Sequence, residues 1–390
     1  MIELRGSTWD HPRGWGGVRA AAEAFSEERP DIRVTWEVRS LQAFADHSIE
    51  ELSSTYDLIV LDHPSIGVAV EAGALVPLDE HLDGTFMEEQ AASGVGRSHE
   101  SYTWEGHQLA LAIDAAAQVA AFRPDLLRRA QVELPRTWGE VITASEALRG
   151  HGLTIAIPSI PVDAVCAFLG TCGSVGEAPF ASPDRVVGRD TGRGALQVLR
   201  DVVVRSHPAS MSWNPPTVLE QMANADEIAY VPLAFGYANF ARQGFARHPL
   251  GFAAGPAGAS GVPSGTLGGA GLAVSASSVH VEEACAFAAF TASPDVQRTA
   301  YVDGGGQPGH RSAWTDPTVN ASAGGFFEDT LDALDAAYLR PRYGGFLVFQ
   351  EEAGDIVHRH LRDGGDADAV LDALDASYRA SLGTRAGAER

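Results

Sequence analysis

Tyr56-Asp-Leu-Ile-Val-Leu-Asp62 holds four consecutive apolar residues, Leu58 to Leu61. An unbroken apolar run of this length is typical of a parallel strand that is buried on both faces, whereas a half-exposed strand alternates apolar and polar residues. His63-Pro64 follows the run and ends it. The stretch therefore predicts a central strand of an α/β sheet.

The segments before this strand alternate between strand and helix patterns. Residues 2–5 form a short extended run, and residues 6–14 contain enough Gly and Pro to predict a loop. Helical spacing follows at residues 18–28, then a period-two strand at residues 32–38 and a helix-like stretch at residues 41–55. Strand, helix, strand, helix, strand is the order of an α/β fold with a parallel sheet.

Lysine is absent from this 390-residue chain. All 28 basic residues are arginine, against 51 acidic residues, so the formal net charge is −23. Without lysine there is no Schiff-base residue and no Walker-type phosphate loop. An acidic chain is also a poor partner for nucleic acid or an anionic membrane, because clustered cations bind both. The composition thus excludes imine chemistry and disfavours polyanionic partners.

Cysteine usage and the N-terminal pattern bear on the cellular compartment. Cys166, Cys172 and Cys285 lack Cys-x-x-Cys spacing, so buried free thiols are expected instead of disulfides or a zinc cluster. No apolar run reaches the roughly 18 residues that span a bilayer. The chain begins Met-Ile-Glu-Leu-Arg-Gly, without a secretory leader pattern. We therefore expect a cytoplasmic protein, or a periplasmic or extracellular one if a leader has been removed.

Several short motifs follow one another along the chain. They are Glu71-Ala-Gly-Ala-Leu-Val-Pro-Leu-Asp79, Trp104-Glu-Gly-His-Gln-Leu-Ala110, Phe122-Arg-Pro-Asp-Leu-Leu-Arg-Arg-Ala130, Leu134-Pro-Arg-Thr-Trp-Gly-Glu-Val141, Leu267-Gly-Gly-Ala-Gly-Leu-Ala-Val-Ser275, Thr291-Ala-Ser-Pro-Asp-Val-Gln297 and Gly304-Gly-Gly-Gln-Pro-Gly309. Within the fourth, Thr137 and Glu140 have the spacing of a helix capping box. In this order the motifs resemble those of ABC-transporter solute-binding proteins of extracellular family one, the periplasmic sugar-binding type.

This resemblance implies an α/β, two-lobe periplasmic-binding-protein-like fold of class II. Lobe one would comprise residues 1–112 plus 248–310, and lobe two residues 113–247 plus 311–390. Strands would cross between the lobes as a hinge, and a small-molecule ligand would bind in the cleft as the lobes close on it. The resemblance further implies an ABC permease as partner. We expect a monomer, with no cofactor and no membrane insertion.

Two loops are the first candidates for ligand contact. In an open α/β sheet, ligands sit beyond the carboxyl ends of the strands. Trp9, Asp10, His11 and Arg13 follow the first strand, and Asp62-His63 follows the buried strand. The alternative is structural: the first loop only shapes a turn with Trp9 in the core, and Asp62 caps a helix.

Further candidates lie near other strand ends and crossovers. They are Arg39, Asp114, Trp213, Tyr230, Tyr237, Gly268, Gly269, Gln307, Arg311 and Tyr343. Aromatic side chains suit a sugar or an aromatic ligand, although core packing is the commoner role of such residues. Glycine lets the backbone approach a ligand closely, but it also suits a plain turn.

Two functions remain open. The first is a solute-binding module for a small polar organic molecule, carbohydrate-like or anionic. The alternative is a leaderless cytoplasmic enzyme on the same fold, a dehydratase, lyase or cyclase that uses no cofactor. In that enzyme Asp10, His11, Asp62 and His63 would be the catalytic acid and base groups, because histidine titrates near neutrality and a carboxylate can orient it. No metal site is predicted.

Overall fold

One sheet runs through the whole molecule. The structure is a computed structural model that describes residues 1–40 and 48–383; part of the helix predicted at residues 41–55 therefore lies outside the described residues. The strand order is β2-β1-β3-β10-β6-β8-β7, with β9 beside β6. The strands of this sheet are β1 (Ile2–Trp9), β2 (Ile32–Arg39), β3 (Leu58–Leu61), β6 (Leu111–Phe122), β7 (Thr154–Ile155), β8 (Ile228–Phe235), β9 (Gly251–Ala253) and β10 (Leu267–Val274). A separate two-stranded sheet pairs β4 (Thr103–Trp104) with β5 (His107–Gln108).

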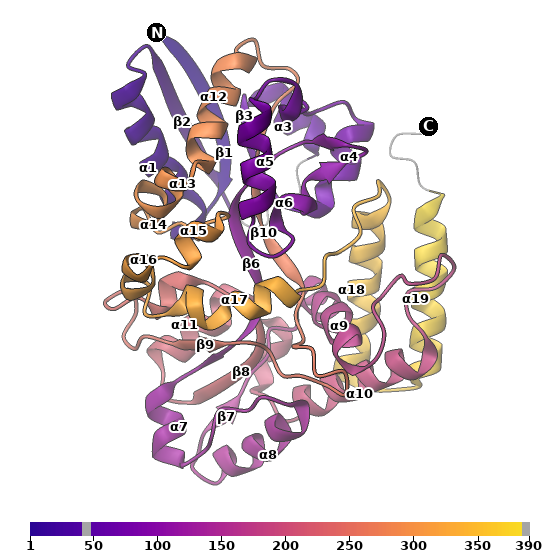
Figure 1. The fold of residues 1–390 in the computed structure, drawn as a ribbon. Helices are drawn as coiled ribbons and strands as arrows, with labels where there is room; N and C mark the ends of the chain where they lie inside the picture. The colour runs from indigo at the N-terminus through magenta and orange to yellow at the C-terminus, as the bar shows by residue number, and fades with distance from the viewer. Residues whose placement is uncertain (41–47, 384–390) are drawn as a thin grey trace.

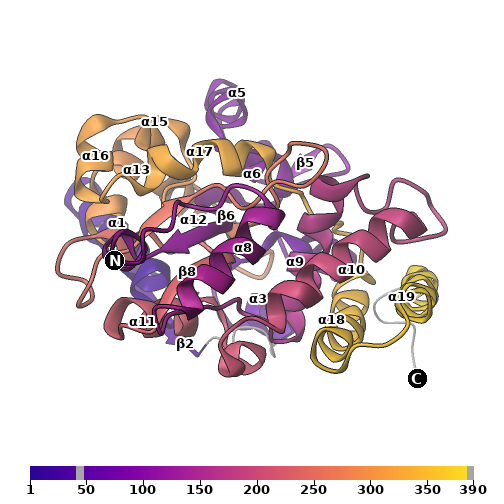
Figure 2. The ribbon, with the colours of Figure 1, turned by 90° about the horizontal axis from the view of Figure 1, so that it is seen from below.

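Helices cover this sheet in two groups, which form two lobes (Figure 1). Around β1 to β3 are α1 (Pro12–Glu28), α3 (Ile49–Thr55), α4 (Ile66–Glu71), α5 (Gly84–Ser93), α6 (Ser98–Ser101), α12 (Val281–Ala292), α13 (Pro294–Arg298) and α14 (Ala300–Asp303). The remaining helices are α7 (Pro124–Ala130), α8 (Trp138–Arg149), α9 (Pro161–Val175), α10 (Arg189–Val203), α11 (Pro215–Asn224), α15 (Arg311–Trp314), α16 (Pro317–Ser322), α17 (Phe326–Ala336), α18 (Phe346–Asp363) and α19 (Ala367–Leu382). From below, α18 and α19 lie beside α9 and α10 at one end of the molecule (Figure 2). None of the described helices is both long and apolar enough to cross a bilayer.

The predicted central strand is confirmed as β3. It pairs in parallel with β1 on one side and antiparallel with β10 on the other. Leu58 and Val60 pack into a core formed with α1 and α12, while Ile59 and Leu61 pack into the opposite core with α3 and α4. Both faces of the strand are therefore covered, which is why its sequence shows no alternation. The capping box of Thr137 and Glu140 is confirmed at the start of α8.

The loop predicted at residues 6–14 is wrong in length, because it is much shorter in the structure. Strand β1 continues to Trp9 and α1 begins at Pro12, so only Asp10 and His11 lie between them. Gly6 keeps the strand paired, because a Cβ atom there would lie only 2.5 Å from the Trp36 ring on β2. Pro12 occupies the first helical position, where its missing N–H removes no hydrogen bond. The glycine and the proline thus serve a strand and a helix instead of a loop.

Strands β6 and β10 connect the two lobes. The first half of β6 pairs with β10, and its second half pairs with β8 and β9 (Figure 1). Gln307 is fully buried beside this crossing: its Nε2 donates to the Ala115 carbonyl at 2.8 Å, and its Oε1 accepts from the Ala238 N–H at 3.0 Å. One side chain therefore ties the crossing strand β6, the segment after β8 and the segment around Gln307 to one another.

The pairing of β9 bears on the predicted lobe boundaries. Residues 248–266 were expected in lobe one, but Gly251–Ala253 pairs with the end of β6 that also carries β8. Ala257 likewise exchanges backbone hydrogen bonds with Arg136 and Trp138 next to α8. We propose that this crossover lies near Leu267, where β10 begins, and that residues 248–266 belong with lobe two.

Replacing Gln307 with Ala is expected to lower the free energy of unfolding by about 3 kcal/mol. The buried Ala115 carbonyl and Ala238 N–H each lose a partner, and an unsatisfied buried polar group costs about 1–3 kcal/mol. Urea denaturation measures the change. Gln197→Ala on the exposed face of α10 is the control and should stay within about 0.5 kcal/mol of the parent. Equal midpoints for the two variants would contradict this account of the hinge.

Candidate functional site

A cavity of about 540 Å³ lies where the two lobes meet. It is lined by Trp9, Arg13, Asp62, Asp114, Ala116, Ile160, Val162, Asp163, Cys166, Asn214, Pro215, Pro216, Phe235, Tyr237, Gly268, Gly269, Ala270 and Arg340. These residues come from the ends of β1, β3 and β8, the crossing strands β6 and β10, the N-terminal parts of α1, α9 and α11, and, for Arg340, the segment between α17 and α18. Ligand sites of open α/β sheets occupy this kind of position.

Arg13 and Asp114 form a buried ion pair in the cavity wall. Arg13 Nε donates to Asp114 Oδ2 at 2.9 Å, Nη2 donates to Oδ1, and Nη1 donates to the Gly236 carbonyl at 2.9 Å. The guanidinium also lies over the Tyr237 ring, 4.7 Å from its centroid. Burial alone would lower the pKa of Arg13, but the Asp114 carboxylate more than offsets this effect, so the guanidinium stays charged.

A second ion pair joins Asp62, which follows β3, to Arg340, in the segment between α17 and α18. Arg340 Nη2 donates to Asp62 Oδ2 at 3.1 Å, and Nη1 donates to Gln350 Oε1 at 2.8 Å. Burial acts to raise the pKa of Asp62, but the charges of Arg340 and His63 outweigh it and hold that pKa below its usual range. Arg340 is almost fully buried, yet its Nε has no hydrogen-bond partner among the described residues.

Asp163 is the acidic group of the lining that lacks a partner in the described part of the chain. It lies in the first turn of α9, is only 3 % exposed, and its Oδ2 makes no hydrogen bond. Burial raises the pKa of Asp163 to about 7, against the opposing charge of Arg340. Near neutral pH this carboxyl group therefore exchanges between its protonated and ionised forms.

Seven of the predicted site residues line the cavity together: Trp9, Arg13, Asp62, Asp114, Tyr237, Gly268 and Gly269. The two glycines are on β10, where a side chain would collide with its surroundings. A Cβ at Gly268 would lie 2.7 Å from the Phe235 ring, and one at Gly269, whose φ is +101°, would lie 2.3 Å from the Asp114 carbonyl oxygen. Their role in the structure is close packing of β10 against β6 and β8.

The other predicted residues lie elsewhere. Asp10 is exposed in the short turn after β1, and Arg39 is buried opposite Trp9 at the end of β2. Tyr230 is inside the core of lobe two, and Trp213 stacks on His207 with the ring centroids 4.7 Å apart. Arg311 pairs with Asp335 at the surface.

Three further predictions fall on structural contacts. The Tyr343 hydroxyl meets Ser381 Oγ at 2.7 Å on the lobe-two side, and Gln307 is in the hinge. His11 Nδ1 accepts from the Arg13 N–H at 3.0 Å, so it caps α1, and its ring meets Tyr237 edge-on. Of these three, none belongs to the cavity lining.

The predicted cluster of two Asp/His pairs does not form in the cavity. Of Asp10, His11, Asp62 and His63, only Asp62 is among the lining residues. His63 is fully buried next to Asp62, and burial, with the charge of Arg340, lowers its pKa to about 4. Burial likewise lowers the pKa of His11 to about 4, assisted by Arg13. Both imidazoles are neutral at pH 7, and neither contacts the cavity.

Sequence reasoning missed Arg340, Asp163, Cys166 and Asn214. Asp163 follows β7, so the strand-end rule would have found it had it been applied there. Asn214 has the signal of a helix cap, and its Oδ1 accepts from the Thr217 N–H at 3.0 Å. Arg340 carries no local signal, because the segment around it is neither strand nor helix.

The cysteines are buried free thiols, as predicted. Burial raises the pKa of Cys166, the one that lines the cavity, to about 11. It is therefore protonated at neutral pH and a weak nucleophile. Within residues 1–40 and 48–383, no three His, Cys, Asp or Glu side chains converge as metal ligands would.

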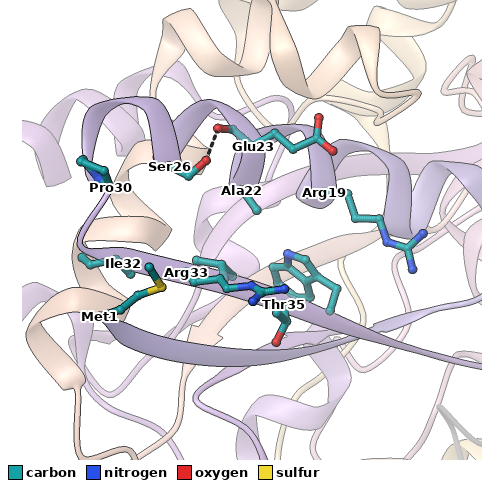
Figure 3. A pocket seen from close by; sticks show the side chains of 11 residues that line it. Met1, Arg19, Ala22, Glu23, Ser26, Pro30, Ile32, Arg33 and Thr35 are labelled. Atoms are coloured by element: carbon teal, nitrogen blue, oxygen red, sulfur yellow. Dashed lines mark hydrogen bonds between the residues drawn. The ribbon is translucent and has the colours of Figure 1, made fainter.

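A second cavity, of about 530 Å³, lies between α1 and the edge strand β2 (Figure 3). It is lined by Met1, Arg19, Ala22, Glu23, Ser26, Pro30, Ile32, Arg33, Val34, Thr35 and Trp36. The Ser26 hydroxyl donates to the Glu23 carbonyl there at 2.7 Å. All of these residues belong to the β1-α1-β2 unit at one edge of the sheet, whereas the crossing strands β6 and β10 lie further along the strand order (Figures 1 and 3).

Solved structures with a similar fold cover nearly the whole chain. Maltose-bound MalE3 of T. maritima is 20 % identical, with 97 % of this chain and 99 % of that chain covered and a TM-score of 0.83. The GacH receptor of Streptomyces glaucescens, solved unliganded and with acarbose, is 20 % identical, with coverages of 98 % and 99 % and a TM-score of 0.79. An ABC transporter solute-binding protein of Agrobacterium radiobacter in complex with ribitol is 18 % identical, with coverages of 97 % and 98 % and a TM-score of 0.80. These likenesses confirm the two-lobe periplasmic-binding-protein-like fold.

Sequence comparison identifies the family. No curated protein sequence matches the chain. The profile of the family described as bacterial extracellular solute-binding protein matches residues 16–298, which is more than half of the chain. This match agrees with the fold and with the cavity between the lobes, and the chain belongs to the bacterial extracellular solute-binding protein family.

Proposed function

We propose that this protein captures a small polyhydroxylated solute, a sugar or polyol without negative charge, between its two lobes. The observation that carries this proposal is the charge arrangement of the cavity. Both arginines in the lining are already bound to carboxylates, Arg13 to Asp114 and Arg340 to Asp62. An anionic solute would have to compete with these buried pairs, and breaking such a pair is strongly unfavourable.

Unmet polar groups in the lining support a hydroxyl-rich solute. Arg340 Nε is a buried donor without a partner, and Asp163 Oδ2 is a buried acceptor without one, among the described residues. A hydroxyl group both donates and accepts, so it suits this pair of groups. Trp9, Phe235 and Tyr237 add aromatic surface, which packs against the C–H faces of sugar rings.

The related structures agree with this class of solute. Those proteins were solved with maltose, acarbose and ribitol bound. Of the two classes considered from the sequence, carbohydrate-like and anionic, the cavity charges favour the carbohydrate-like class. The family description also supports an extracellular or periplasmic location over a cytoplasmic one. It further supports delivery of the solute to an ABC permease as the function of binding.

Neutral sugars and polyols are expected to stabilise the protein, whereas the corresponding uronic acids are not. A solute present at about one hundred times its Kd raises the free energy of unfolding by about 2.7 kcal/mol. Thermal unfolding with each member of matched pairs, such as glucose and glucuronate, measures the effect, and titration calorimetry gives the Kd. Tighter binding of the uronates would refute the charge argument.

Arg340→Gln is expected to weaken solute binding at least tenfold, which corresponds to about 1.4 kcal/mol. The variant removes the unmet donor at Nε and leaves Asp62 without its cation in the cavity wall. It should also destabilise the fold, by about 3–5 kcal/mol, because one charge of a buried pair remains unpaired.

Arg311→Gln is the matched control for this substitution. Its ion pair with Asp335 is at the surface, and exposed pairs contribute about 0–1 kcal/mol. Calorimetric titration of both variants separates binding from stability. Equal losses of affinity in the two variants, or a loss only for Arg311→Gln, would place the site elsewhere.

A further inference from the structure

Asp163 is a buried carboxyl group aimed into the cavity with no hydrogen-bond donor beside it among the described residues. It is 3 % exposed and belongs to the lining, yet its Oδ2 is buried and accepts no hydrogen bond from any described residue. Buried polar atoms in folded proteins almost always have partners, and a carboxylate left without one loses the solvation that water would give it. The missing donor must therefore come from what fills the cavity.

We propose that the solute carries a protonated amino group, as an amino sugar or amino polyol does, and that this ammonium group pairs with Asp163. The proposal rests on the function proposed above and narrows its substrate class. Asp163 is then the specificity-determining residue of the site, because it separates an amino solute from the otherwise identical hydroxyl compound.

The charge count of the lining favours an ammonium group over a hydroxyl. The cavity holds three aspartates, Asp62, Asp114 and Asp163, against two arginines, Arg13 and Arg340. The first two aspartates are paired with the arginines, so ionised Asp163 leaves one uncompensated negative charge. A hydroxyl would satisfy one lone pair and leave that charge buried. An ammonium group supplies three donors and cancels the charge.

The ionisable groups around Asp163 fix how this pairing depends on pH. The charge of Arg340 acts to lower the pKa of Asp163, and the charge of Asp163 in turn raises the pKa values of Cys166 and Tyr237. On α18, which packs against α9, His358 Nδ1 meets the Ser159 carbonyl at 2.6 Å. Arg340 stays charged, and the thiol and phenol are protonated, with pKa values raised to about 11 and about 12 by burial. Asp163 is therefore the cavity group that titrates near neutrality, since burial raises its pKa to about 7.

Matched solutes that differ only in one hydroxyl or amino group test the proposal. The pairs are D-glucose and D-glucosamine, D-galactose and D-galactosamine, and sorbitol and 1-amino-1-deoxysorbitol, each titrated calorimetrically into the full chain at pH 7. For at least one pair the amino compound should bind at least tenfold more tightly than its hydroxyl counterpart. Its affinity should fall by up to tenfold per unit as pH drops from 7 to 5.5, because protonated Asp163 cannot pair with an ammonium group. The hydroxyl compound should show no such fall.

Asp163→Asn should remove both the tenfold preference and its pH dependence. Asp190→Asn is the matched control, because Asp190 also lies in the first turn of a helix, α10, but is fully exposed. This control should bind as the parent does. Persistence of the amino preference in Asp163→Asn would overturn the assignment to Asp163. Equal binding of the two members of each pair would overturn the amino proposal and leave the sugar-binding function standing, whereas no binding by any member would overturn both.

A ligand-free measurement checks the unpaired carboxyl itself. The folded state raises the pKa of Asp163 above its value in the unfolded chain, so the folded state holds the proton more tightly. The stability of the parent relative to Asp163→Asn should consequently decrease as pH rises from 4 to 7 and level off above. Urea denaturation of both proteins across this range gives the difference. A difference independent of pH would show that Asp163 finds a partner in the empty protein, which would overturn the proposal.

Discussion

The ion pair between Arg13 and Asp114 ties the two lobes to the strand that crosses between them. Arg13 begins helix α1 of lobe one, Asp114 is on β6, and the third guanidinium bond reaches the Gly236 carbonyl beyond the end of β8. Burying a charge is tolerable only when it is paired and hydrogen-bonded, and loss of one partner costs about 3–5 kcal/mol. This ion pair therefore holds three elements together at one point: the start of α1, the middle of β6 and the end of β8. The cavity is built around that point.

The same requirement shapes the chemistry of the cavity. Asp62 and Arg340 repeat the pairing elsewhere in the cavity lining, and Arg340 comes from a segment more than two hundred residues away in sequence. With both arginines committed, the cavity offers a carboxyl group and a single unmet guanidinium donor to a solute. The overall charge of −23 has the same sign as this local surplus of aspartate, so steering by the field of the protein opposes anions.

Local sequence patterns predicted best those features that depend on the residues of a single strand or helix. The apolar run Leu58–Leu61 and the capping box at Thr137 both appear as predicted, because each depends on residues within one strand or one helical turn. The rule that ligands bind beyond the carboxyl ends of the strands selected Trp9 and Asp62, which line the cavity. It failed for His11 and His63 because it gives the end of the strand but not the direction of each side chain. His11 turns back to cap α1, and His63 turns into the protein.

By itself, the sequence determined the order of strands and helices, the acidic character of the chain and the absence of lysine chemistry, because these follow from residue types and their spacing. Only the tertiary structure decided which aspartates are paired and which is left over. Pairing depends on distances between residues far apart in the chain: Arg13 meets Asp114, and Arg340 meets Asp62. Asp163 is unpaired for the same reason, since α9 points it into a cavity whose two cations are already bound.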